Sequence, residues 1–220
     1  MARRTRKEAL ETREGILDAA EACFLEHGPS RTSLEAIASR AGCTRGAVYW
    51  HFKNKIEVLD AVLDRVQTPM LMRMDAAIRK DTATPLANLL AVTRESLAEF
   101  GTNPHIRNAI EILEMRCELV EETASVFERH LRGHQRARAN IETAFTRAAA
   151  IGKLKPGVTV ETCTNTLMWI LFGALHTHFL APERHDMAER VMAALEVALH
   201  GMVREDYLAQ ILKGSVAVPA

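Results

Sequence analysis

Apolar residues recur three or four positions apart along most of this chain, and this spacing limits its possible folds. Within residues 10–27, Ile16, Ala20 and Phe24 lie four positions apart, and a Gly-Pro pair follows. Such a period gathers the apolar side chains on one face of an α-helix. The β-branched run at 158–160 has three residues and follows Pro-Gly, which is too short for a credible strand.

Capping residues divide the following segment into short helices. Thr32 with Glu35 has the spacing of a capping box, and Thr44 offers its hydroxyl to the next helix. Asn54 with Glu57 opens a fourth helix that runs to about residue 80. We therefore predict an all-α chain of about nine helices, whose first three form a helix-turn-helix domain.

Charge is distributed unevenly along the 220 residues. The whole chain has 28 Lys and Arg against 28 Asp and Glu, which excludes a uniformly basic coat for nucleic acid. Residues 1–55 nevertheless hold ten basic and seven acidic residues. We predict a first domain with a basic N-terminal arm at 1–55, whose charge favours DNA binding, a second helical domain at 56–213, and a disordered tail at 214–220.

Several protein classes are disfavoured by the same sequence. The chain opens on charge rather than on an apolar stretch, so we expect no secretory signal. The strictly apolar run Leu167–Leu175 is shorter than the roughly 20 residues of a membrane-spanning helix. The four cysteines show no C-x-x-C spacing, which argues against a disulfide framework or a zinc knuckle. We expect a soluble cytoplasmic protein without a membrane partner.

The segment 41–52 has the pattern of a turn followed by a recognition helix. Gly42 allows a steep exit, and Val48 and Phe52 would face the first two helices. Arg45 and Tyr49, four apart, then share an outward face that enters the major groove.

The side chains of this face suit DNA, although similar helices also occur in ordinary bundles, where basic residues are merely solvated. Arg45 can donate two hydrogen bonds to guanine, and Gly46 lets the backbone approach the bases. Hydroxyl, imidazole and ammonium groups suit phosphates. The candidate DNA-binding residues are Thr32, Ser33, Thr44, Arg45, Gly46, Tyr49, Trp50, His51 and Lys55.

The segments 32–38 and 41–55 resemble the signature of the TetR/AcrR family of transcriptional repressors. The opening 1–9, and Glu111-Ile112-Leu113 with Cys117-Glu118, resemble the subgroup that represses multidrug efflux operons. The resemblance implies that Arg45 reads bases and that Thr44, Tyr49, His51 and Lys55 hold phosphates. It also implies a ligand-responsive repressor of an efflux operon and of its own promoter, bound to an approximately palindromic operator. On this resemblance, residues 1–55 are the DNA-binding domain and residues 56–213 are the ligand-binding and dimerisation domain.

Such an operator needs two recognition helices, and therefore a two-fold dimer. The resemblance implies that the helices expected at 158–181 and from 186 onward pair with their mates in a four-helix bundle. The alternative is that both helices serve only the core of one chain. The candidate interface residues are Leu167, Leu175, Val191, Leu195, Ala198 and Met202.

A small amphipathic effector is the second implied partner. The resemblance and helical facing suggest a pocket lined by Val66, Met70, Val92, Ser96, Ile110, Glu114, His134, Ile141, Met168, Phe172 and His176. Glu114 borders the apolar stripe of Ile110 and Leu113, and two interpretations stay open. It either edges a solvated acidic face or leans into the pocket, where it would attract cationic amphipaths.

Other chemistry finds little support in the sequence. His130 and His134 have a spacing that metals use, but arginines crowd them and no third ligand is evident, so we expect no metal. The cysteines are expected as buried small side chains rather than redox sensors. No catalytic motif appears, and we expect neither an enzyme nor a cofactor. The alternative functions are a TetR-type activator or repressor of non-efflux metabolism and a ligandless adaptor that binds protein.

Overall fold

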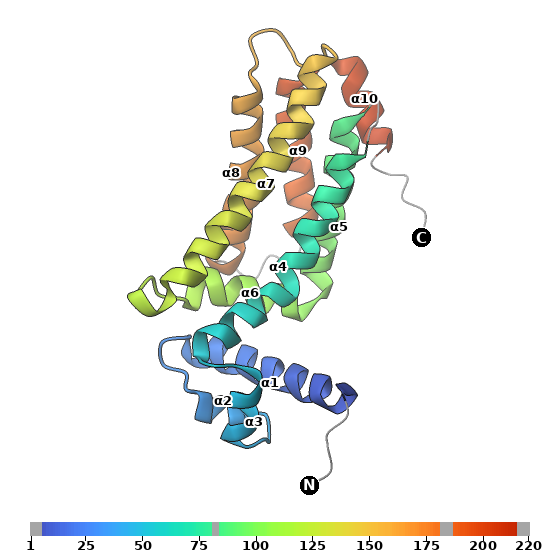
Figure 1. Ribbon diagram of the computed structural model, residues 1–220. Coiled ribbons are helices and arrows are strands. Elements are labelled where there is room, and N and C mark those ends of the chain that lie inside the picture. Colours follow the sequence, from blue (N-terminus) through green and yellow to red (C-terminus); the bar gives the residue numbers. More distant parts are fainter. Residues whose placement is uncertain (1–5, 81–83, 181–186, 215–220) are drawn as a thin grey trace. The chain divides into compact units, whose positions relative to one another are not determined.

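The computed structural model describes residues 6–80, 84–180 and 187–214, and within them the chain is helical almost throughout (Figure 1). The all-α prediction is confirmed. Ten α-helices are present in these ranges, because the closing segment divides after Met202 into two helices. The α-helices are α1 (Arg6–His27), α2 (Leu34–Arg40), α3 (Arg45–His51), α4 (Lys55–Arg79), α5 (Pro85–Thr102), α6 (Pro104–Glu111), α7 (Ala124–Ala150), α8 (Val160–Leu180), α9 (Met187–Met202) and α10 (Glu205–Gly214), with a π-helix η1 (Ile112–Arg116) and a 3-10 turn η2 (Glu121–Thr123).

The helices pack into two compact units. The first unit comprises residues 1–68 and 104–131, and the second comprises 69–103 and 132–220. Helices α4 and α7 contribute residues to both units. By packing, α6 and η1 therefore join the N-terminal helices, whereas the predicted division at residue 55 concerns function and stays a prediction. Predicted features at Arg3, Arg4 and 215–220 lie outside the described residues.

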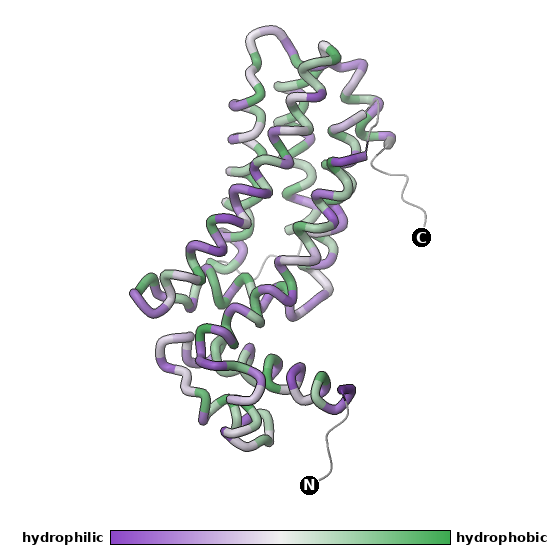
Figure 2. The backbone as a smooth tube through the Cα atoms, viewed as in Figure 1, coloured by the Kyte–Doolittle hydropathy of each residue, from purple (hydrophilic) through white to green (hydrophobic). Residues whose placement is uncertain are grey.

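The first unit buries one apolar face of each of its three N-terminal helices. Ile16 and Phe24 of α1, Ile37 of α2 and Val48 of α3 are each fully enclosed in one core. Figure 2 shows the corresponding alternation of hydrophobic and hydrophilic residues along the tube. Burial of this kind stabilises roughly 1.5–3 kcal/mol per large side chain, enough to hold helices too short to persist alone.

The cap of α2 differs from the prediction. Ser33, not Thr32, is the N-cap, and its hydroxyl accepts a hydrogen bond from the Ala36 N–H at 3.2 Å. Thr32 is buried instead, and its hydroxyl donates to the Gly28 carbonyl at 2.8 Å. Thr32 therefore ties the α1–α2 turn together. The cap has moved one residue along the chain, so Glu35 occupies the second helical position rather than the third.

Helix α4 opens at Asn54 and Glu57, as predicted. The Asn54 side chain accepts from the Glu57 N–H at 2.9 Å, while the Glu57 carboxylate accepts from the Lys53 N–H at 2.6 Å. The first bond satisfies an exposed donor of the first helical turn, and the second ties the residue before the N-cap to the helix. The helix then continues through Pro69 to Arg79.

The second unit has its own core, formed by α5, α8, α9 and α10 with parts of α4 and α7. Phe145 and Tyr207 are fully buried there. The Tyr207 hydroxyl accepts from the Leu86 N–H at 3.4 Å, so the buried phenol has a partner at the first turn of α5. The Arg147 guanidinium donates to the Ile78 carbonyl and so holds the end of α4.

Four of the six predicted interface residues belong to this core. Leu167, Val191, Leu195 and Met202 are at most 7% exposed within a single chain. The packing of α8 and α9 against each other and against α5 encloses these four side chains, and their role in a dimer interface stays a prediction. Leu175 and Ala198 are half-buried.

The outer faces of α8 and α9 carry different apolar residues. Trp169 is 72% exposed, Leu180 68% and Val197 74%. A groove of about 530 Å³ lies between the two helices and is lined in part by Ile170 and Ala174. These helices are therefore apolar on two sides. In the described ranges no helix combines the length and the apolar character needed to cross a bilayer.

Candidate nucleic-acid interface

Helix α3 is anchored on its inner side and open on its outer side. Val48 is fully buried and Phe52 is 2% exposed, as predicted. The Arg13 guanidinium lies 5.2 Å from the centroid of the Phe52 ring, which fixes the end of α3 against α1. The Thr44 hydroxyl accepts from the Ala47 N–H at 3.1 Å and caps the helix.

The turn before α3 depends on glycine. Gly42 has φ +63°, the left-handed region that other residues adopt at a cost. No atom lies within 4 Å of a Cβ built on Gly42, so backbone conformation rather than space requires glycine there. Gly46 lies on the exposed side of α3, and the only neighbour near its missing Cβ is the Thr44 hydroxyl at 3.8 Å.

The outer side of α3 exposes large side chains that a solvated helix seldom carries. Tyr49 is 45% exposed and Trp50 is 73% exposed. The Trp50 ring meets the His51 ring edge-on, with centroids 4.5 Å apart. Flat aromatic surface beside a guanidinium can stack on sugars and bases as well as donate hydrogen bonds to them.

The guanidinium of Arg45 is held from two directions. Its Nη1 lies 2.6 Å from the Glu35 carboxylate of α2, and its Nη2 donates to the Tyr49 hydroxyl at 3.1 Å. The same guanidinium lies 5.2 Å from the centroid of the Tyr49 ring. A hydrogen bond from its own backbone N–H and the Arg45 charge keep the pKa of Glu35 below its usual value.

Sequence reasoning missed the contact between Glu35 and Arg45. Glu35 was interpreted as the distal member of a capping box, a role that would direct its carboxylate to a backbone N–H. With Ser33 as the cap, Glu35 is one position too early for that role. Its carboxylate reaches α3 instead.

Two predicted DNA contacts are enclosed by the protein. Thr32 is 4% exposed, and its hydroxyl is bonded within the first unit. The Lys55 side chain is 15% exposed, with its ammonium 3.3 Å from both the Ser30 carbonyl and the Glu122 carboxylate. The open residues are therefore Ser33, Thr44, Arg45, Gly46, Tyr49 and Trp50, with His51 half-buried and Lys53 exposed beside them.

Comparison with known proteins identifies the family of this helical unit. Residues 16–62 match the model of bacterial regulatory proteins of the tetR family. The chain is 35% identical over 174 residues to the transcriptional repressor BepR of Brucella suis biovar 1 (strain 1330), covering 79% of this chain and 83% of BepR. The chain belongs to the TetR family.

Solved structures of TetR-family proteins agree over most of the chain. The structure of SmeT, the repressor of the Stenotrophomonas maltophilia multidrug efflux pump SmeDEF, superposes with a TM-score of 0.75. It shares 38% identity and covers 89% of this chain and 92% of SmeT. A complex of SmeT with triclosan gives a TM-score of 0.80 at 39% identity, over 90% of this chain and 94% of SmeT.

A buried carboxylate in this TetR-family chain links three helices of the first unit, and sequence reasoning missed it as well. Glu21 of α1 is 5% exposed and pairs with Arg65 of α4. From α6, the amide of Asn108 donates to Glu21 at 2.7 Å, and His105 Nδ1 lies 2.9 Å from it. A buried charge requires such partners, and here they come from residues up to 87 positions away.

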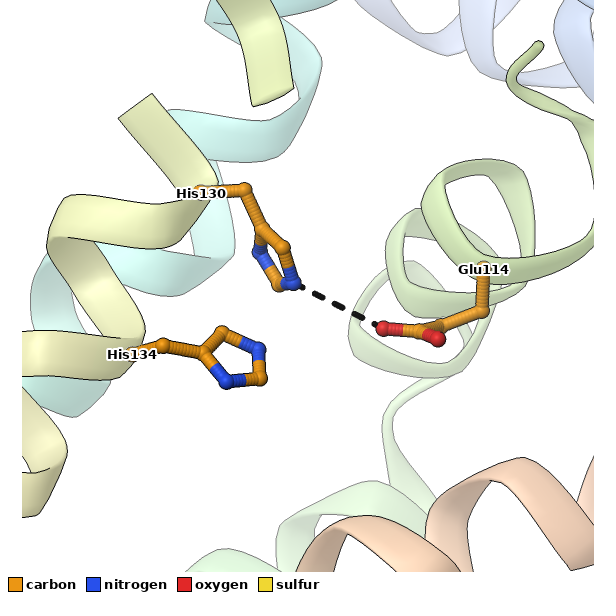
Figure 3. Close-up of side chains that lie close together, drawn as sticks. All are labelled: Glu114, His130 and His134. Atoms are coloured by element: carbon orange, nitrogen blue, oxygen red, sulfur yellow. Dashed lines mark ion pairs between the residues drawn. The ribbon is translucent and has the colours of Figure 1, made fainter. Parts of the chain in front are cut away.

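Residues predicted to line an effector pocket fall in both units. Val66, Ile110 and Glu114 belong to the first unit. Glu114 lies in the π-helix η1, and its carboxylate is 3.6 Å from His130 Nε2 of α7 (Figure 3). Its side chain is 30% exposed. The sequence placed no acidic partner beside His130, because α7 follows η1 only after a turn that periodicity does not reveal.

The other predicted pocket residues belong to the second unit. His134 of α7 stacks on Phe172 of α8, with ring centroids 4.0 Å apart. The Ser96 hydroxyl donates to the Val92 carbonyl within α5 at 2.8 Å. Val92 and Ile141 are buried, Met70, Met168 and Phe172 are half-buried, and His176 is exposed. Their joint role in binding stays a prediction.

The cysteines differ in accessibility. Cys23 and Cys163 are buried, and Cys43 and Cys117 are half-buried, all as free thiols. Burial raises the pKa of Cys163 to about 11 and also raises that of Cys117. Both shifts disfavour the thiolate, which is the reactive form.

Proposed function

We propose that this TetR-family chain is a homodimeric cytoplasmic repressor of a multidrug efflux operon and of its own promoter. The observation that carries this proposal is the outer face of α3, where Arg45, Tyr49 and Trp50 are exposed while Val48 and Phe52 anchor the helix. The likeness to BepR and to SmeT supports the repressor role and the efflux operon. Each half of an approximately palindromic operator would receive one α3.

The outer faces of α8 and α9 support the dimer. Trp169, Leu180 and Val197 are exposed on these two helices, which also line an apolar groove, and exposed apolar surface of this kind favours a protein partner. A two-fold axis would bring the same patch of each protomer together, so every apolar residue is used twice. We therefore replace the predicted interface residues of the inner faces by these outer ones.

A small amphipathic effector would release the protein from DNA. The SmeT–triclosan complex supports an effector of this size, and the half-buried aromatic pair of His134 and Phe172 is a suitable wall for one. Release requires the effector to bind the DNA-incompetent state more tightly, so that its binding shifts the population. We place the effector in the helices C-terminal to residue 55.

A nuclease footprint on the DNA flanking the gene tests the repressor. We expect one protected, approximately palindromic site beside an efflux-pump operon, and release of the site by micromolar triclosan or ethidium. A protected site beside metabolic genes would favour the non-efflux regulator. Absence of any protected site in the presence of folded dimer would favour the ligandless adaptor.

The Glu114→Gln variant tests how the effector is recognised. If the Glu114 carboxylate attracts cationic amphipaths, release by ethidium weakens in the variant while release by neutral triclosan is unchanged. The contact between the Glu114 carboxylate and His130 Nε2 supplies a second measurement, because His130→Gln removes the imidazole from beside the carboxylate and should change the response to ethidium more than the response to triclosan. Equal responses of parent and Glu114→Gln to ethidium would assign Glu114 to the solvated surface.

A further inference from the structure

The ion pair between Glu35 and Arg45 joins the two helices of the helix-turn-helix at its outer surface. Glu35 lies on α2 and Arg45 opens α3, and the side chains are 53% and 59% exposed. Ion pairs at this exposure contribute little to stability, because water screens the charges. The fold of the first unit therefore does not depend on this contact, and its consequence is the position of the guanidinium.

The two intramolecular contacts of Arg45 do not use all of its hydrogen-bond donors. A guanidinium has five N–H groups, of which one serves Glu35 at 2.6 Å and one serves Tyr49 at 3.1 Å. A guanine edge needs two donors, for O6 and N7. Arg45 can thus bind a base while both intramolecular contacts persist. A free arginine would lose rotamer freedom on binding, whereas this side chain is already restricted.

The Glu35 carboxylate has a second effect, on charge. Binding to DNA of any sequence depends on the number of phosphates neutralised by basic groups. Beside Arg45, the carboxylate cancels one positive charge of the recognition surface and repels nearby phosphates. This repulsion weakens binding to DNA of every sequence equally. The hydrogen bonds of a positioned guanidinium strengthen binding only where a guanine lies opposite Arg45.

We propose that Glu35 is a positioning and specificity-determining residue, which holds Arg45 for one base pair per half-site and suppresses binding to other DNA. The inference rests on the proposed DNA-binding function. It assigns to α2 a role in sequence discrimination without requiring that Glu35 touch the DNA.

Selection from a randomised DNA duplex pool, with the full-length protein, tests the proposal. Wild-type protein should enrich a palindromic site, and Glu35→Gln should enrich the same site with one position per half-site relaxed. In titrations, Glu35→Gln should bind scrambled duplex about two- to fivefold more tightly. Discrimination against substitution at the relaxed position should fall by about tenfold.

Two controls separate positioning from charge. Glu26→Gln removes the same charge from the pair with Arg40, which has a similar exposure of 54% and 45% and lies in the same unit. It should preserve base discrimination, because Arg40 is not on α3. In an Arg45→Ala background, Glu35→Gln should change binding to scrambled duplex but leave base preference unaltered.

The outcomes distinguish this proposal from the proposed function. Unchanged discrimination in Glu35→Gln, or an equal loss in Glu26→Gln, overturns the role of Glu35 while operator binding stands. Failure of folded wild-type dimer to enrich any sequence overturns the proposed function itself. Equal circular dichroism spectra and thermal midpoints of parent and Glu35→Gln would exclude a folding defect as the cause.

Discussion

Two tryptophans are almost equally exposed, yet their surroundings differ. Trp50 on α3 is 73% exposed and Trp169 on α8 is 72% exposed. Trp50 follows Arg45 and precedes Lys53, with no acidic residue from 43 to 55, whereas α8 and α9 also expose Leu180 and Val197. In the proposed function the first ring faces nucleic acid and the second faces another protein surface, and the character of the neighbouring residues is what separates the two proposals.

The buried residues of α3 and α8 fix which side of each helix faces outward. Val48 and Phe52 fix the rotation of α3, and Leu167 and Cys163 fix that of α8, since each is buried in the core of its unit. A helix whose buried face is occupied has one face left for a partner. Substitutions on the outer faces can therefore test the two proposed partners without disturbing the fold.

Val197→Glu should have the largest effect. In the proposed two-fold interface the change places two unpaired carboxylates in an apolar seam, at a cost of several kcal/mol. We expect monomers in analytical ultracentrifugation and loss of operator binding. Val197→Ala should leave dimers, since it removes little buried area.

Gln210→Glu supplies a matched control for that experiment, because it adds the same charge on the exposed side of α10. It should stay dimeric. Fully dimeric Val197→Glu protein would remove the outer face of α9 from the interface, and the partner assigned to Trp169 would then have to be reconsidered.

Arg45→Ala should weaken operator binding next most strongly, by roughly 5- to 150-fold, the range for losing a two-bond contact to one base. Affinity for scrambled duplex should fall much less, because Arg45 is already paired with Glu35. Filter binding at two salt concentrations measures both affinities. Arg40→Ala, which removes an exposed arginine from α2, is the control; equal loss on operator and scrambled DNA would contradict base reading by Arg45.

Features of the structure that depend on residues close together in the sequence could be predicted, and features that depend on distant residues could not. Helix spacing and turns are local, so the all-α fold, the inward Val48 and the outward Arg45 were all predictable from residues a few positions apart. The prediction that Thr32 caps α2 was wrong for a local reason. Thr32 and Ser33 are adjacent and both residue types cap helices well, so the tertiary contacts of Thr32 decide between them.

The contacts that could not be predicted from the sequence join residues that are far apart along the chain. Glu21 meets Asn108 across 87 positions, and periodicity contains no information about such pairs. The choice of interface residues depends on similar long-range information. Leu195 and Val197 are both apolar residues of one helix, and which of them faces the core depends on the packing of α5 and α8 against α9.

Cysteine labelling extends the comparison of the two regions. Cys43 lies in the turn before α3 and is half-buried, whereas Cys163 of α8 is buried with its pKa raised from 9.0 to about 11. Raising a thiol pKa by that amount lowers its thiolate fraction about 100-fold at neutral pH. Iodoacetamide should therefore modify native Cys43 and spare Cys163, as read by peptide mass spectrometry.

Operator DNA should protect Cys43 by a few-fold and leave Cys163 unaffected, because Cys43 lies in the turn before α3 and Cys163 is already buried in the second unit. Urea-unfolded protein should label at both positions, which controls for intrinsic reactivity. Native Cys163 that reacts as fast as Cys43 would contradict the closed packing of α8.

The smallest effect concerns two ion pairs, one in each compact unit. Asp75 of α4 is 16% exposed, accepts from Arg136 Nε at 3.0 Å and from Asn140 Nδ2 at 2.7 Å, and lies in the second unit. These two donors, Arg136 first, hold the pKa of Asp75 below its usual value. Asp75→Asn should therefore cost about 1 kcal/mol of unfolding free energy at pH 7, the net value of a hydrogen bond to a charged group reduced by partial exposure.

The sign of the pH dependence follows from that lowered pKa. The carboxylate stabilises the fold where it is ionised in both states, above about pH 4, and this contribution is lost as the pH falls through the folded-state pKa. Urea unfolding should thus separate parent from Asp75→Asn at pH 7, and the difference should be smaller at about pH 3. Glu35→Gln should leave the urea midpoint unchanged at both pH values, since its pair with Arg45 is open to water. A destabilised Glu35→Gln protein would show that the ion pair between α2 and α3 stabilises the fold instead of positioning the Arg45 guanidinium.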